Sequence, residues 1–112
     1  MSRETRRLNL QSRLEEILGS KNVYFQPPAS IHMKYPCFVY NYDNANILHA
    51  GNVPYKDYDR YTLTLITKDP LPETVMSEID SIPYVRFSRH FVEDNLHHFS
   101  YTVSLTERTN ND

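Results

Sequence analysis

The chain has 112 residues, 39% of them hydrophobic and 12% aromatic, including nine Tyr and five Phe, which suits one domain with a partly tyrosine core. Twelve basic and fourteen acidic residues give a formal net charge of −2. Apart from an arginine-rich start the two signs are mixed along the chain. This pattern does not favour a nucleic-acid-binding protein, which usually carries a clustered basic surface.

Cys37 is the only cysteine, which excludes an internal disulfide and a cysteine-based zinc cluster. The charged N-terminus MSRETRR is not followed by the apolar segment of a signal peptide, and no run approaches the roughly 18 apolar residues of a membrane span. We therefore expect a soluble protein that has no signal peptide and makes no membrane contact.

Residues 5–18 predict an amphipathic helix, because apolar residues recur there at helical spacing: Leu10, Leu14, Ile17 and Leu18. Gly19 is suited to end this helix in a left-handed conformation. Four arginines lie at or near its start, where the helix dipole disfavours cations: Arg3, Arg6, Arg7 and Arg13. They are therefore candidates for a contact outside the helix, such as an acidic neighbour or a second protein, and simple solvation is the alternative.

The next predicted elements lie on either side of a proline-rich corner. The short apolar run 23–25 is stopped by Gln26-Pro27-Pro28. Residues 30–40 predict a strand that is amphipathic at first and buried on both faces from 37 to 40, with Pro36 at an edge or a bulge. The irregular, Asn-rich and Asp-rich segment 41–58 then predicts a hairpin with a long tip and a short strand at 45–49.

Four apolar residues of that tip are candidates for an interface: Ile47, Val53, Tyr55 and Tyr58. Exposed on a loop, they would offer a contact surface, and the alternative is that they fold back over the sheet. The carboxylates of this region, Asp57 and Asp59, are expected to be solvated.

The second half of the chain has the clearest strand pattern. Residues 58–66 alternate, with Tyr61, Leu63 and Leu65 on one face. Pro72 at the first helical position, followed by Val75, Met76, Ile79 and Ile82, predicts a short helix closed by Pro83. Residues 84–92 and 96–105 predict a hairpin around the polar turn 93–95.

In the first strand of that hairpin, strict alternation places Arg86, Ser88 and His90 on one basic face and Arg89 with the aromatic residues on the core-facing side. This basic face either meets solvent or a subunit, or contacts nucleic acid. RNA-binding sheets present aromatic platforms among their cations, and here the aromatics fall on the other side. Arg86 and Arg89 are therefore kept as interface candidates.

The pattern as a whole predicts an α+β fold: a single domain over residues 1–105, a mainly antiparallel sheet of about five strands with two helices packed on it, and the order α-β-β-β-α-β-β. Residues 106–112 have too little apolar content to pack and are expected to be a flexible tail.

We find no constellation of residues for catalysis, a cofactor or a metal. His97 and His98 are adjacent and would point to opposite faces of a strand, so they cannot chelate one ion from a regular strand. Cys37 lacks a paired histidine and is expected to be a buried apolar residue. Only two glycines are present, so a glycine-rich phosphate loop is not expected. The sequence therefore predicts a protein that is not an enzyme.

Four segments resemble a family of small neck and tail proteins of tailed bacteriophages: 22–28 (NVYFQPP), 33–40 (MKYPCFVY), 58–70 (YDRYTLTLITKDP) and 94–99 (DNLHHF). The similarity covers roughly residues 8–105 in the same order. Within this family the nearest role is the tail terminator, also called the tail completion protein.

That resemblance implies a structural virion protein in the neck at the top of the tail, assembled in the host cytoplasm. It implies a homo-oligomer, typically a hexameric ring, that caps the tail-tube protein and joins the tail to the head-closure complex. DNA could pass through such a ring without specific nucleic-acid recognition. The alternatives are a head-tail connector or head-closure protein and, from another class, a nucleic-acid-binding module.

Overall fold

The computed structural model describes residues 2–50 and 53–105, and for residues 44–50 and 53–58 it gives the course of the backbone alone. The expected tail 106–112 lies outside the described residues. The order of elements is the one that the sequence predicts: α1 (Arg3–Leu18), β1 (Val23–Phe25), β2 (Cys37–Ala50), β3 (Val53–Thr67), α2 (Glu73–Asp80), β4 (Val85–Glu93) and β5 (Leu96–Leu105). The prediction of an α+β fold is confirmed. Neither described helix combines the length and the apolar character needed to cross a membrane.

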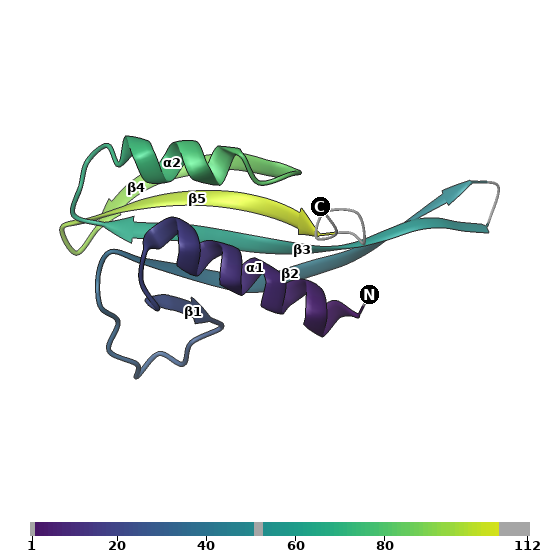
Figure 1. Cartoon of the computed structure of the whole chain (residues 1–112), viewed down its shortest axis with the longest axis horizontal. Helices are drawn as coiled ribbons and strands as arrows, with labels where there is room; N and C mark the ends of the chain where they lie inside the picture. The colour runs from purple at the N-terminus through teal and green to yellow at the C-terminus, as the bar shows by residue number, and fades with distance from the viewer. Residues whose placement is uncertain (1, 51–52, 106–112) are drawn as a thin grey trace.

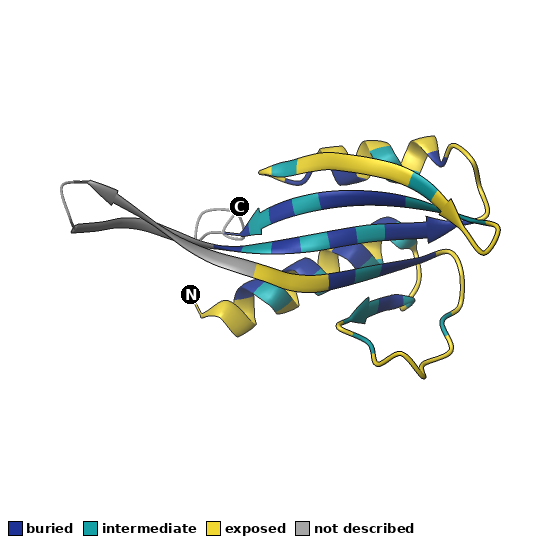
Figure 2. Ribbon diagram, turned by 180° about the vertical axis from the view of Figure 1, so that it is seen from behind, coloured by how far each residue is buried: buried dark blue, intermediate teal, exposed yellow. Residues whose placement is uncertain are grey.

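The five strands form one mixed sheet in the order β1-β2-β3-β5-β4. β1 runs parallel to β2, and every other neighbouring pair is antiparallel. Both helices lie on the same face of the sheet (Figure 1), which we call the helix face. Figure 2 looks onto the opposite face, the open face, which no helix of the described chain covers. The two faces therefore have different surroundings and different chemistry.

Helix α1 begins two residues earlier than the sequence predicts. The Ser2 hydroxyl accepts a hydrogen bond from the Thr5 backbone N–H at 3.1 Å, which satisfies one of the free donors of the first turn. At the other end Gly19 takes φ 76° and donates its N–H to the Glu15 carbonyl at 2.8 Å. The predicted apolar stripe packs on the sheet, because Leu10, Leu14 and Ile17 are buried there and Leu18 is partly buried.

The predicted strand over residues 30–40 is wrong in its first half. β2 begins only at Cys37, where its parallel neighbour becomes available and the Phe38 N–H reaches the Asn22 carbonyl at 3.0 Å. Residues 26–36 form a loop that the Tyr24 hydroxyl holds by accepting a hydrogen bond from the Lys34 N–H at 3.1 Å. Alternating apolar residues did not make a strand there because no described strand lies beside them to complete a ladder.

The predictions for α2 and the last hairpin are confirmed with small changes. Pro72 occupies the N-cap of α2, one position before the predicted one, and Ile79 is the fully buried residue of this helix. Asp94 and Asn95 both have positive φ, at 53° and 64°, which is typical of a two-residue turn that suits the twist of a hairpin.

The core lies between the helix face and the two helices. It is built from the alternating residues of β3 and β5 with the predicted stripe of α1, and three tyrosines belong to it: Tyr40, Tyr61 and Tyr101. Burial raises the pKa of Tyr61 and of Tyr101 to about 12. The expectation of a partly tyrosine core is therefore confirmed.

Candidate assembly interface

The hairpin of β2 and β3 projects from the body of the protein (Figure 1). β1 supports β2 only as far as Tyr40, and β5 supports β3 only from Asp59 onward. The chain between them, residues 44–50 and 53–58, is a two-stranded ribbon that we call the arm. It lengthens the molecule to 49 Å along one axis, against 25 Å along the other two.

The hairpin and the strand at 45–49 that the sequence predicts are confirmed, but the long irregular tip expected within residues 41–58 is wrong, because a nearly continuous antiparallel ladder runs through the described residues there. The ladder shifts register only between Tyr42 and Asn44 and between Leu48 and His49. Pairing between the strands supplies backbone hydrogen bonds whatever the local strand propensity, which explains why an Asn-rich segment forms strands.

The arm carries the four apolar interface candidates, Ile47, Val53, Tyr55 and Tyr58, whose side chains lie outside those the structure describes. Their backbone runs away from the sheet instead of folding back over it (Figure 1).

A buried ion pair lies at the root of the arm. The Asp59 carboxylate is 1% exposed and accepts a hydrogen bond from Nη2 of Arg6 at 3.0 Å and from Nε of Arg3 at 3.0 Å. The Tyr42 hydroxyl donates to the same carboxylate at 3.3 Å. Desolvation raises the pKa of Tyr42, and the Asp59 carboxylate raises it further, because a second negative charge beside a carboxylate is unfavourable. This cluster fixes the first turn of α1 against the base of the arm.

The other two N-terminal arginines also bind within the chain. Arg7 donates to the Tyr40 hydroxyl at 3.1 Å and lies over the Phe25 ring at 4.5 Å from its centroid. Arg13 donates to the Ser81 hydroxyl at 3.1 Å, which connects α1 to the end of α2. An acidic neighbour outside the helix is thus found for Arg3 and Arg6, whereas Arg7 and Arg13 form ion pairs with Glu4 and Glu16 of α1 itself at 3.0 and 3.5 Å. A contact of any of the four with a second protein stays a prediction.

The predicted alternation of β4 is wrong beyond Phe87, because a bulge at Ser88 shifts the register with β5. Phe87 pairs with Tyr101, whereas Arg89 pairs with Ser100 and His90 with Phe99. Since opposed residues in an antiparallel pair share a face, the bulge moves Arg89 to the open face and His90 to the helix face. Arg86 and Arg89, two interface candidates that strict alternation separates, therefore lie on the same face.

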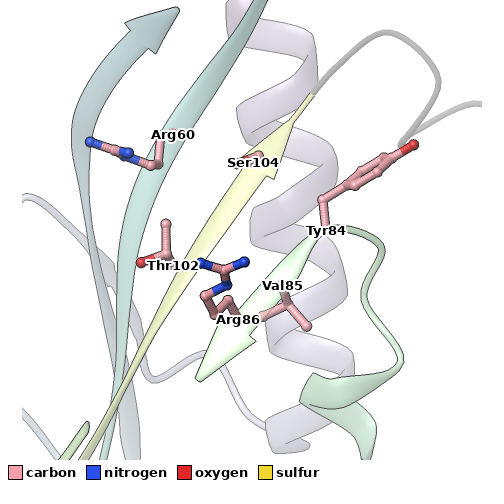
Figure 3. A pocket seen from close by; sticks show the side chains of 6 residues that line it. All are labelled: Arg60, Tyr84, Val85, Arg86, Thr102 and Ser104. Atoms are coloured by element: carbon pink, nitrogen blue, oxygen red, sulfur yellow. The ribbon is translucent and has the colours of Figure 1, made fainter. Parts of the chain in front are cut away.

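A groove of about 430 Å³ crosses the open face between β3, β5 and β4 (Figure 3). It is lined by Arg60, Tyr84, Val85, Arg86, Thr102 and Ser104. Arg60 forms an ion pair with Asp43 at 2.9 Å, while Arg86 lies beside its register partner Thr102 and makes no ion pair with a described residue. The groove thus offers guanidinium and hydroxyl donors, which are the groups that recognise carboxylate or phosphate oxygens.

Histidines gather near the turn of the last hairpin. The rings of His90 and His97 stack at an interplanar angle of 10°, with 2.9 Å between Nε2 of His90 and Nδ1 of His97. On the open face, His98 stacks on its register partner Phe91. The prediction that His97 and His98 face opposite ways is confirmed. Among the residues whose side chains the structure describes, no three His, Cys, Asp or Glu come together as metal ligands would. The His90–His97 pair was missed because the bulge that creates it leaves no trace in the alternation.

The expectation that Asp59 is solvated is wrong, because its side chain is buried. A signal was available: Asp59 continues the alternation of the buried residues Tyr61, Leu63 and Leu65. A carboxylate in phase with a buried face indicates a buried partner, and the arginines at the start of α1 are that partner.

Comparison with known proteins does not assign the chain to a family. No protein-family model matches the chain, and no curated protein matches it.

Proposed function

We propose that this protein is a structural virion subunit of a tailed bacteriophage, the tail terminator, whose hexameric ring caps the tail tube and joins it to the head-closure complex. The four segments that resemble the neck and tail family support this role. The α+β order of elements agrees with the fold that this resemblance implies.

The arm is the observation that carries an assembly function. A two-stranded hairpin alone in water is at best marginally stable, and this one extends beyond the strands that support it. Its sequence includes Ile47, Leu48, Val53, Tyr55 and Tyr58, residues that gain free energy when a partner covers them. A subunit that presents such an arm on one side needs a receiving surface on another copy or on the tail tube.

The test is to mix the purified protein with its tail-tube protein and to examine the tubes by electron microscopy. A terminator limits tube length and forms a ring at one end of each tube. Tubes that grow without limit in its presence contradict the proposal. Binding to phage heads that carry the portal, and not to tubes, indicates a head-tail connector. DNA binding whose affinity falls steeply with salt indicates a nucleic-acid-binding module.

A variant without the arm identifies the element responsible. Ala45 and Asp59 are register partners, so an Asn-Gly turn can join them in place of residues 46–58 and leave the Asp59 ion pair intact. We expect this variant to fold and to fail to cap tubes. Capping equal to that of the full chain would show that the arm is not the assembly element.

A further inference from the structure

The outer edge of β4 has no partner strand in the described chain. β4 is the last strand in the sheet order, and only β5 pairs with it. In an antiparallel ladder the backbone groups of alternate residues point toward the neighbouring strand, and those of the residues between them point away from it. The edge of β4 therefore presents a row of backbone donors and acceptors that no described strand satisfies.

The turn of the last hairpin identifies half of this row. A two-residue turn such as the one at Asp94 and Asn95 closes on a hydrogen-bonded pair of residues, which here are Glu93 and Leu96. Alternation from this pair along β4 directs the backbone groups of every second residue away from β5. His90 and Val92 are two of these outward-directed residues.

The start of the strand identifies the other half. The Ser104 N–H donates a hydrogen bond to the Tyr84 carbonyl at 3.2 Å, so alternation from this pair directs the backbone groups of Val85 and Phe87 outward. The bulge at Ser88 lies between the two halves. The four outward-directed residues share one further property, because their side chains all lie on the helix face: Val85, Phe87, His90 and Val92.

Two of these side chains are apolar and incompletely covered. Phe87 is 47% exposed although it packs edge-on against Tyr101 of the core, and Val92 is 57% exposed. A strand added to this edge would complete the ladder and bring its own side chains beside Phe87 and Val92. The edge of β4 thus offers both the hydrogen bonds and the apolar surface that an added strand uses.

The arm has a second open edge of the same kind. The Tyr42 N–H donates to the Gln26 side chain at 3.0 Å, and beyond this point residues 44–50 pair with β3 and with no other described strand. These residues extend about 23 Å at roughly 3.3 Å each, and the nine residues of β4 extend about 30 Å. The arm strand therefore fits within the length of the β4 edge.

The two edges cannot meet within one molecule, because β3 and β5 lie between β2 and β4 in the sheet (Figure 1). A second copy of the chain can bring them together. An arm from one copy on the β4 edge of the next is a head-to-tail contact, and such a contact closes into a ring or continues as a filament.

Charge separates the arm from the other long open edge that a second copy offers, which is its own β4. Pairing of two β4 strands would gather two copies each of Arg86 and Arg89 on the open face, and like charges across a strand pair are destabilising. Residues 44–50, with the sequence NANILHA, contain no Lys, Arg or Pro. This strand can pair with β4 without that repulsion and with all of its backbone donors.

We propose that residues 44–50 of one copy add as a further strand to the β4 edge of the next copy. This pairing rests on the proposed function, because it names the surfaces that join neighbouring subunits of the ring. Main-chain hydrogen bonds supply the affinity of such a contact, and the side chains beside Phe87 and Val92 supply its register.

Two variants each remove one half of the contact. The arm variant joins Ala45 to Asp59 through an Asn-Gly turn and keeps the β4 edge. The edge variant, His90→Pro with Val92→Pro, keeps the arm and removes two N–H groups that point away from β5, where an edge strand tolerates proline. Its matched control, His90→Ala with Val92→Ala, loses the same side chains and keeps both N–H groups.

Self-association of each protein is measured by sedimentation velocity at several protein concentrations. We expect the natural chain to form rings or filaments and the arm variant to stay monomeric. The edge variant should associate about tenfold or more weakly than its alanine control, because it lacks two intermolecular backbone hydrogen bonds. Equal association of these two proteins overturns the strand pairing.

Mixing the arm variant with the edge variant tests the head-to-tail geometry. One protein retains the β4 edge and the other retains the arm, so one contact can form between them and no further contact can follow. We expect a complex of one chain of each kind and nothing larger. An arm variant that dimerises by itself indicates pairing between two β4 strands and overturns the inference.

Circular dichroism of each variant verifies that it is folded. If the proline substitutions unfold the protein, His90→Lys with Val92→Lys replaces them, since lysines on an edge strand oppose the approach of another strand. A natural chain that stays monomeric also overturns the inference, because the bulge and the arginines of β4 then serve to protect its edge from pairing.

Tube capping is measured on the same proteins. An edge variant that still forms rings at the ends of tail tubes overturns the contact and leaves the terminator function standing. A natural chain that associates through the arm and leaves the tubes uncapped overturns the terminator function and leaves the contact standing.

Discussion

Asp59 shows how one buried charge fixes the geometry around it. Its carboxylate is surrounded by Arg3, Arg6 and Tyr42, so most of its hydrogen-bonding capacity is satisfied inside the protein. Arg6 is itself 5% exposed, which means that both members of this pair have given up their hydration. The intact pair therefore adds little to the free energy of unfolding. Removing one partner is costly, because the other charge stays buried without compensation.

We expect Asp59→Asn to lower the free energy of unfolding by about 3–5 kcal/mol, because it leaves the buried Arg6 charge without compensation. Denaturant unfolding measures the effect. The control is Asp43→Asn, which breaks the solvent-exposed pair with Arg60 and should cost about 0–1 kcal/mol. Equal midpoints for the two variants would contradict the assignment of a buried pair.

Cys37 should be chemically inert in the folded protein. Burial raises the pKa of its thiol to about 11, and the side chain is fully buried at the start of β2. The reactive thiolate is therefore scarce at neutral or mildly alkaline pH, and reagents have no access to it. A thiol-reactive dye should label the protein only after denaturation, with the denatured chain as the positive control. Rapid labelling of the native protein would disagree with this burial.

At the scale of the elements, α1 behaves as its sequence pattern indicates. The helical spacing of the apolar residues places Leu14 at the centre of the contact with the sheet, where it is fully buried. Leu8 is outside that stripe and is 48% exposed. The same helix thus provides a core leucine and a surface leucine for comparison.

We expect Leu14→Ala to lower the free energy of unfolding by about 2–5 kcal/mol, since it removes buried apolar surface and leaves a cavity under the helix. Leu8→Ala should change it by no more than about 0.5 kcal/mol. Thermal or denaturant unfolding of both variants provides the measurement. A large loss of stability in Leu8→Ala would indicate that another molecule covers this leucine in solution.

In strand β4 the alternation of the sequence predicts the wrong face for the residues after Phe87, and the reason is physical. Alternation assumes an unbroken pleat, and one extra residue at Ser88 exchanges the faces of everything after it. The choice between a continuous strand and a bulged one depends on the fit of Phe87 against Tyr101 and of His90 against Phe99. Those contacts involve residues of β5 and are absent from the local sequence of β4.

At the scale of the whole molecule, the core contains ionisable groups that should report on alkaline unfolding. Burial raises the pKa of Tyr61 and Tyr101 to about 12, above the value of 10.0 for a free tyrosine. The folded state therefore holds these protons more tightly than the unfolded state does. Their contribution to stability is constant below pH about 10 and is lost as pH rises from there toward about 12.

We expect tyrosinate absorbance to rise in two stages, the later of which belongs to Tyr61 and Tyr101 and accompanies loss of the near-UV circular dichroism. The control is the same titration in denaturant, where all nine tyrosines should ionise in one step. A single step in the native protein without loss of tertiary structure would contradict the burial of these two hydroxyls.

The sequence by itself determined which segments form the helices, the strands of the second half and the stripe of α1 that enters the core. Those features follow from local periodicity, as Leu10, Leu14 and Ile17 illustrate, because burying one side of a helix or strand imposes a repeat on the chain. Only the tertiary structure decided the burial of Asp59, the face of Arg89 and the projection of the arm. Each of these depends on a partner far away in the sequence: an arginine of α1, a register shift against β5, or the point at which a supporting strand ends.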